Sequence, residues 1–168
     1  MPKILVFDTE TTGLPASRSS SIYNTHEWPY VVQLSFVFYD LDYNNLLDYG
    51  DYIIQIPKTV KIDPKAQEVH GISYDVTQSK GVPLNTALNH FDKLLLECDL
   101  IVGHNVSFDK RMIMVECIRN NRKQQFTINN KRKEEFCTMK ESKTLCKIDA
   151  LNHTTGEHYF KYPKLLEL

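Results

Sequence analysis

The stretch Phe7-Asp8-Thr9-Glu10-Thr11-Thr12-Gly13-Leu14 follows the apolar run Ile4-Leu5-Val6, so two carboxylates stand at the end of a predicted buried strand. Side chains alternate along a strand, and Asp8 and Glu10 therefore point to the same side. Two ionised carboxylates at such a place repel each other unless a cation lies between them. Hard oxygen ligands of this kind suit Mg²⁺ or Mn²⁺. The pair predicts a divalent metal site, and a strand end with two solvated acids is the alternative.

The bulk properties of the chain are those of an ordinary globular protein. Its 168 residues suit one domain, and 42% hydrophobic and 24% charged residues lie in the usual range. The longest apolar runs are far shorter than a membrane span, and the N-terminus lacks the pattern of a signal peptide. We expect a single domain over residues 1–168, located in the cytoplasm or another intracellular compartment, with no membrane partner.

Charge and cysteine content exclude some classes of protein. A net charge of −1 argues against a broad basic surface for nucleic acid, but it leaves room for a narrow active-site cleft. A basic stretch over residues 119–133 is interpreted either as solvated surface or as an edge that contacts phosphates. The four cysteines are too widely spaced for a C-x-x-C motif and too few for a disulfide scaffold, so we expect them to be reduced and mostly structural.

Strands and helices alternate along the chain. After a polar segment, residues 31–39 are rich in β-branched and aromatic residues, and residues 48–56 form a second predicted strand. Asn44-Asn45 marks the turn between them, which predicts an antiparallel hairpin.

In the second half of this pattern, predicted helices surround one short strand. Residues 64–69 predict a short helix that ends near Gly71, and apolar residues repeat at helical spacing over residues 84–95. A short buried strand over residues 100–103 precedes a helix that extends to Ile118. This order predicts an α/β layered sheet.

A second polar cluster, Gly103-His104-Asn105-Val106-Ser107-Phe108-Asp109, lies at this strand-to-helix junction. Sites in open α/β sheets form beyond the carboxyl ends of strands, so Asp109 is expected to reach the same metal as Asp8 and Glu10. The alternative is an acid that only interacts with the helix dipole. The segment Val69-His70-Gly71-Ile72 contains a further histidine, which alone favours a structural role.

Together these segments resemble the DEDD family of 3′-to-5′ exonucleases, within the DnaQ-like branch that includes the proofreading subunit of bacterial DNA polymerase III and ribonuclease T. F-D-T-E-T-T-G-L is similar to the first family motif, V-H-G-I to a segment that contacts the terminal nucleotide, and G-H-N-V-S-F-D to the second motif. Phe136-Cys137-Thr138-Met139 and residues 163–168 resemble later family segments. The resemblance implies a ribonuclease H-like mixed sheet, with a three-stranded antiparallel N-terminal part and parallel strands, flanked by helices.

The resemblance also implies the chemistry. Asp8, Glu10 and Asp109 would be the catalytic residues and would ligate two Mg²⁺ or Mn²⁺ ions, with a histidine as general base. The substrate would be single-stranded or frayed 3′ ends of DNA, with RNA left open, and a DNA polymerase is a further partner that the resemblance suggests. The expected substrate-binding residues are Thr11, Gly13, Leu14, Val69, His70, His104, Asn105 and Phe108.

The third family motif, H-x-x-x-x-D near the C-terminus, has no counterpart after Asp109. His153 and His158 are the histidines in this region, and no Asp follows either of them. We therefore expect a C-terminally truncated exonuclease domain that lacks its general base, fourth ligand and last helix, and is impaired in activity. An inactive module that binds 3′ ends or associates with a polymerase is the alternative.

Overall fold

The computed structural model describes residues 2–168, which form a five-stranded sheet in the order β3-β2-β1-β4-β7. Its strands are β1 (Lys3–Thr11), β2 (Val31–Asp40), β3 (Asn45–Ile53), β4 (Leu100–Gly103) and β7 (Glu134–Cys137). The helices are η1 (Thr25–Glu27), α1 (Pro64–His70), α2 (Tyr74–Lys80), α3 (Leu84–Glu97), α4 (Val106–Arg119), α5 (Thr138–Glu141), α6 (Lys143–Cys146) and η2 (Leu165–Glu167). Two small hairpins complete the fold: β5 (Thr127–Ile128) with β6 (Lys131–Arg132), and β8 (Asp149–Leu151) with β9 (His158–Phe160).

Strand β1 lies at the centre of the sheet. It pairs antiparallel with β2 and parallel with β4, while β2 and β3 form an antiparallel hairpin and β4 and β7 run parallel. This arrangement confirms the predicted α/β class and the mixed sheet with an antiparallel part and parallel strands.

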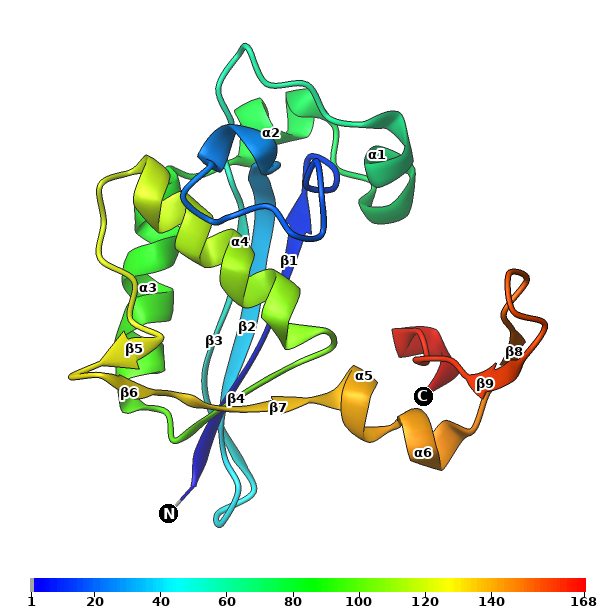
Figure 1. Ribbon diagram of the computed structural model, residues 1–168. Helices are drawn as coiled ribbons and strands as arrows, with labels where there is room; N and C mark the ends of the chain where they lie inside the picture. The colour runs from blue at the N-terminus through cyan, green and yellow to red at the C-terminus, as the bar shows by residue number, and fades with distance from the viewer. Residues whose placement is uncertain (1) are drawn as a thin grey trace.

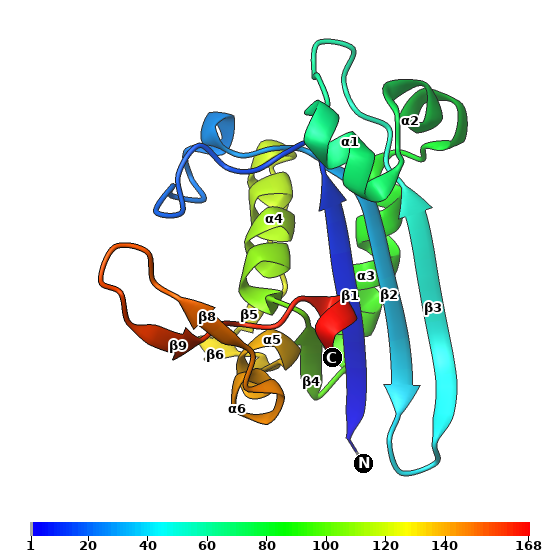
Figure 2. The same ribbon diagram turned by 90° about the vertical axis from the view of Figure 1, so that its right-hand side faces the viewer.

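Helices α3 and α4 cover one face of the sheet (Figures 1 and 2). Alternate residues of β1 point into this layer, where Leu5 and Phe7 are buried and the Phe7 ring meets Phe91 of α3 edge-on at a centroid distance of 5.2 Å. On the other face Val6 is 37% exposed and Val37 is 41% exposed. This second face, which we call the open face, also carries Asp8 and Glu10, because they alternate with the buried residues of β1.

The short helix predicted at residues 64–69 is α1. Asp63 caps it by accepting a hydrogen bond from the Lys65 N–H at 2.8 Å, and Pro64 occupies the first helical position. Gly71 ends it in the left-handed conformation with φ 72°. Helix α2 was not predicted, and Ser73 caps its start, because its hydroxyl accepts a hydrogen bond from the Val76 N–H.

The strand predicted at residues 48–56 begins and ends three residues earlier, as β3. The turn occupies residues 41–44 and not Asn44-Asn45, since the Asp40 carboxylate accepts hydrogen bonds from the Asp42 and Tyr43 N–H groups and Asn44 has φ 49°. These bonds close the turn early and leave Asn45 free to pair with Asp40.

Residues 138–168, which we call the C-terminal lobe, lie together at one side of the molecule (Figure 1). Figure 2 shows η2 in front of β1, on the open face. Among residues 2–168, no helix is long and apolar enough to cross a membrane.

Candidate active site

Asp8 and Glu10 project from the last part of β1 toward the open face. Asp8 is exposed and Glu10 is partly buried, while Thr9 between them is buried toward the helices. Desolvation raises the pKa of Asp8, an effect that His104 opposes. Desolvation and the nearby Asp8 charge raise the pKa of Glu10, and His70 opposes them. The two carboxylates therefore interact electrostatically, as the sequence spacing predicts.

Asp109 approaches the same strand from the first turn of α4. Its side chain is buried, with 2% of the residue exposed, and its Oδ1 accepts hydrogen bonds from the Thr9 N–H at 3.1 Å and the Thr9 hydroxyl at 2.7 Å. Burial raises the pKa of Asp109 to about 7, the Asp8 charge adds to the rise, and the Thr9 hydrogen bonds oppose it. A carboxylate in this position gains from a neighbouring cation.

The three acids fit a divalent metal by donor type and by charge, because each has a raised pKa that a cation would lower. As they stand in residues 2–168, however, no three His, Cys, Asp or Glu side chains form a metal-binding group. Asp109 directs Oδ1 toward Thr9, on the helix side of β1, whereas Asp8 and Glu10 point to the open face. Metal ligation by this set therefore requires a cation to draw the three carboxylates together.

His104 lies beside Asp8 on the open face. Its Nε2 donates to the Pro163 carbonyl at 3.0 Å, and its Nδ1 lies 3.0 Å from the Thr138 hydroxyl. A carbonyl oxygen only accepts, so Nε2 carries the proton, and in the neutral ring Nδ1 accepts from Thr138. Both nitrogens are therefore used to hold the C-terminal lobe against the sheet.

A cavity of about 460 Å³, here called the His70 pocket, opens beside Glu10. It brings together six of the eight predicted substrate-binding residues, and its complete lining is Thr9, Glu10, Thr11, Gly13, Leu14, Asp63, Lys65, Ala66, Val69, His70 and Phe108. Leu14 is 84% exposed and Val69 is 80% exposed, so apolar side chains stand at its rim. Asp63, Lys65 and Ala66 were missed in the sequence, although the Asp63-Pro64 helix start is a usable signal.

His104 and Asn105 are the two predicted substrate-binding residues outside the His70 pocket. His104 lines a shallow cavity of about 320 Å³ on the open face, together with Val6, Asp8 and Leu165. Asn105 has φ 67° at the start of α4 and lines a different groove, described below.

His70 is held by the backbone at both ring nitrogens. Its Nδ1 accepts from the Ile72 N–H at 3.0 Å, which leaves Nε2 as the donor to the Thr11 carbonyl at 3.2 Å in the neutral ring. The histidine thus ties the end of α1 to the end of β1 and sets one wall of the pocket.

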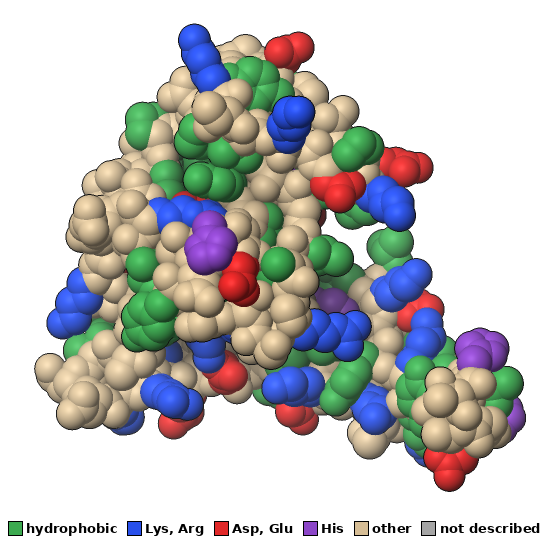
Figure 3. Space-filling model, turned by 45° about the horizontal axis from the view of Figure 1, so that its top comes forward, with side chains coloured by type: hydrophobic (Ala, Val, Ile, Leu, Met, Phe, Trp, Pro, Cys, Tyr) green, Lys and Arg blue, Asp and Glu red, His purple; other side chains and the backbone are tan. Residues whose placement is uncertain are grey.

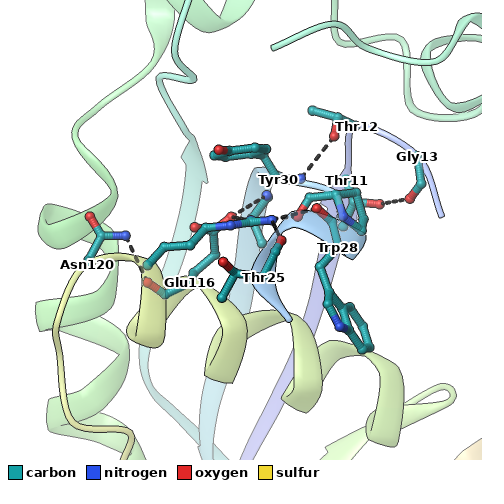
Figure 4. A network of polar contacts seen from close by, with 11 residues as sticks. Thr11, Thr12, Gly13, Thr25, Trp28, Tyr30, Glu116 and Asn120 are labelled. Carbon is teal, nitrogen blue, oxygen red and sulfur yellow. Dashed lines mark hydrogen bonds and ion pairs between the residues drawn. The ribbon is translucent and has the colours of Figure 1, made fainter. Parts of the chain in front are cut away.

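A buried ion pair on α4 fixes the other side of the β1 end (Figure 4). Arg119 and Glu116 are paired at 2.9 Å, and the Glu116 carboxylate accepts from the Val31 N–H at 3.0 Å. The Arg119 guanidinium donates to the carbonyls of Thr25, Trp28 and Pro29, and it lies 3.9 Å from the centroid of the Tyr30 ring. We call these two residues the α4 clamp.

The α4 clamp is connected to the candidate site through hydrogen bonds of the backbone. Tyr30 and Thr12 exchange hydrogen bonds: the Tyr30 N–H donates to the Thr12 hydroxyl at 2.9 Å, and the Thr12 N–H donates to the Tyr30 carbonyl at 2.8 Å. The turn from Thr11 to Leu14, which lines the His70 pocket, is therefore anchored to α4, the helix that also carries Asp109.

The basic stretch of residues 119–133 is partly used inside the fold. Arg122 pairs with Asp92 at 2.7 Å, and Lys133 donates to the carbonyls of Leu96 and Cys98 at the end of α3. With Arg119 in the clamp, three of the cations serve structure, which disfavours a continuous phosphate-contacting edge there. The four cysteines are free, and Cys98, Cys117 and Cys137 are buried.

Comparison with known proteins supports the resemblance. The RNase T family model, described as Exonuclease, matches residues 5–163. No curated protein matches the chain. Among solved structures, exonuclease I in complex with inhibitor BCBP is 15% identical and superposes with a TM-score of 0.68 over 96% of this chain and 35% of that chain.

Two further structures of the same kind are similar. E. coli exonuclease I in complex with a dT13 oligonucleotide has a TM-score of 0.68 at 15% identity, over 96% of this chain and 34% of that one. A product-bound exonuclease I has a TM-score of 0.66 at 16% identity, over 96% and 36%. The chain thus spans about a third of the length of these proteins, and at this identity the likeness confirms the ribonuclease H-like fold. Since the family model covers nearly the whole sequence, the chain belongs to the RNase T exonuclease family.

Proposed function

We propose that this chain is a metal-dependent 3′-to-5′ exonuclease domain that removes nucleotides from single-stranded or frayed 3′ ends. The observation that carries the proposal is the placement of Asp8, Glu10 and Asp109 around the end of β1, directly beside the His70 pocket. The similarity to E. coli exonuclease I in complex with a dT13 oligonucleotide supports single-stranded DNA as the substrate class.

The acids would hold two Mg²⁺ or Mn²⁺ ions, which when bound activate a water molecule and stabilise the leaving 3′-oxygen. Asp8 and Glu10 offer their oxygens from the strand, and Asp109 offers its own from the helix. Thr9 holds the Asp109 carboxylate in place by its two hydrogen bonds. These residues bind and orient, so their substitution abolishes turnover without changing the fold.

The His70 pocket would take the terminal nucleotide. Leu14, Val69 and Phe108 present apolar surface to a base, and such contacts accept any base because each has a stacking face. Lys65 lies on the same lining and supplies a positive charge for a phosphate.

Neither histidine near the acids is free to act as general base. His70 and His104 each use both ring nitrogens in hydrogen bonds within the chain. We therefore expect slow turnover by this chain.

The test uses a single-stranded oligonucleotide labelled at its 5′ end, incubated with excess purified protein in Mg²⁺ or in EDTA. A ladder that shortens one nucleotide at a time, in Mg²⁺ only, supports the proposal. Asp8→Asn, Glu10→Gln and Asp109→Asn should each abolish the ladder, whereas Asp75→Asn, which removes an exposed acid of α2, should leave it unchanged. Release of the labelled 5′ mononucleotide first would instead mean the opposite polarity.

The engaged histidines also favour a second function, binding of 3′ ends without hydrolysis. Fluorescence anisotropy with the same oligonucleotide distinguishes the two. Saturable binding with no product after many hours in Mg²⁺ or Mn²⁺ selects the binding module, and any metal-dependent ladder that Asp109→Asn removes selects the enzyme.

A further inference from the structure

We propose that a second groove binds the sugar-phosphate backbone of the single strand next to its 3′ end. The groove has a volume of about 530 Å³ and is called the Arg18 groove; its lining is Leu14, Pro15, Arg18, Trp28, Asn105, Ser107, Phe108, Arg111, Met139 and Tyr162. The inference rests on the proposed function, and it adds a site for nucleotides that are not being removed.

The Arg18 groove adjoins the His70 pocket. Leu14 and Phe108 line both, so the exposed Leu14 side chain stands between two adjoining hollows. A strand whose last nucleotide occupies the His70 pocket can therefore continue over Leu14 into the groove.

The two hollows differ in charge. The His70 pocket is lined by Glu10 and Asp63 as well as Lys65, whereas the Arg18 groove contains two arginines and no acidic residue. Lys143 adds a third cation, with its Nζ 4.9 Å from the centroid of the Tyr162 ring. In a chain of net charge −1, this local excess of positive charge suits a polyanion.

The two arginines are held differently. Arg111 donates to the Ser20 carbonyl at 2.6 Å and to the Arg18 carbonyl at 3.3 Å, and it stacks on Trp28 at 4.5 Å. It therefore shapes the loop that presents Arg18. Within residues 2–168 the exposed Arg18 side chain makes no hydrogen bond or ion pair, so its guanidinium is free to contact a phosphate.

The opposite wall comes from the C-terminal lobe. Met139 and Tyr162 supply apolar and aromatic surface, and Tyr162 is about half exposed. Stacking on such a ring tolerates any base. In Figure 2 the segment before η1 and the β8-β9 hairpin lie on the same side of α4, one above the other, and Figure 3 shows a notch between the C-terminal lobe and the main body, with Lys and Arg side chains near it.

The test measures binding of oligothymidylates of two and eight nucleotides, labelled with fluorescein at the 5′ end, by anisotropy in Ca²⁺. If the groove binds the strand, the octamer binds at least about 10-fold more tightly than the dimer, because it alone reaches the groove. Arg18→Ala should weaken octamer binding about 5-fold, reduce its salt dependence by about one phosphate contact, and leave dimer binding unchanged. Arg132→Ala, which removes an exposed arginine of β6, is the matched control and should change neither.

Tyr162→Ala and Tyr162→Phe separate stacking from folding. We expect the Phe variant to bind the octamer as wild type does and the Ala variant to lose affinity for the octamer only. An RNA octamer, octouridylate, tests whether the sugar matters. Equal affinity for both octamers supports recognition of the shared sugar-phosphate backbone, and octouridylate binding no tighter than the dimer overturns it.

Equal affinity for dimer and octamer, or an equal loss for both in Arg18→Ala, would overturn the groove while leaving the proposed function intact. Failure of every oligonucleotide to bind would instead overturn the proposed function itself.

Discussion

Asp109 is the candidate ligand whose charge is least well solvated. In an unfolded chain an Asp titrates near a pH of about 4, whereas burial raises the pKa of Asp109 in the fold to about 7. The folded state therefore binds this proton more tightly, and the free energy of unfolding falls as the pH rises through that window.

Asp109→Asn should remove this dependence and still accept the Thr9 hydrogen bonds. In EDTA we expect the variant to be more stable than wild type by about 4 kcal/mol at a pH of about 8, and nearly equal to it at a pH of about 4. Urea unfolding at several pH values measures the difference. A gap that stays constant with pH would show that Asp109 does not titrate in this range.

A bound cation should offset the free-energy cost of burying the ionised Asp109 carboxylate. Mg²⁺ at about a hundred times its Kd should raise the free energy of unfolding of the wild type by about 2.7 kcal/mol. Thermal unfolding with and without EDTA provides the measurement. Asp75→Asn should keep the full gain, and a gain that persists in Asp109→Asn would mean that the cation binds elsewhere.

At the scale of the element, α4 links the two halves of the candidate site. Its first turn carries Asp109, and its last turns carry Glu116 and Arg119, which hold the segment that enters β2. Because one rigid helix carries all three residues, the position of the Asp109 carboxylate relative to the turn after β1 is fixed.

Removing Arg119 from the α4 clamp should lower the stability of the fold, because it leaves the Glu116 carboxylate buried without its partner. We expect Arg119→Ala to lower the free energy of unfolding by about 3 kcal/mol, and the double change with Glu116→Gln to cost less than the sum of the single changes. Urea denaturation of the four proteins in this cycle is the measurement. Lys123→Ala, an exposed change near the same helix end, should cost less than about 0.5 kcal/mol.

At the scale of the whole molecule, the sheet is covered unequally. Leu5 and Val6 are neighbours on β1, but Leu5 is fully buried under the helices while Val6 is 37% exposed on the open face. We expect Leu5→Ala to cost about 3 kcal/mol and Val6→Thr less than about 1 kcal/mol. Chemical denaturation compares them directly, and a large loss in Val6→Thr would mean that the open face is packed in solution.

The sequence was informative where polar residues follow an apolar run. The positions of Asp8 and Glu10 near the end of β1, and of Asp109 in the helix after β4, could be predicted from the apolar runs before them, while their role as metal ligands stays a prediction. The order of strands and helices predicted the α/β sheet. The α4 clamp could not be predicted, since Glu116 and Arg119 look like ordinary helical charges until the backbone carbonyls they meet are known. Nor could Tyr162, which reaches the Arg18 groove from a distant segment, or the early turn at Asp40, which depends on side-chain hydrogen bonds.

The central position of β1 has a consequence for how the protein is made. Its antiparallel partners β2 and β3 follow it closely and emerge early from the ribosome, so Asp8 and Glu10 can be set in a hairpin-backed strand at once. Its parallel partner β4, and with it Asp109, arrives about ninety residues later. The third carboxylate therefore joins the site only when synthesis is well advanced, and a nascent chain stopped before β4 would lack it.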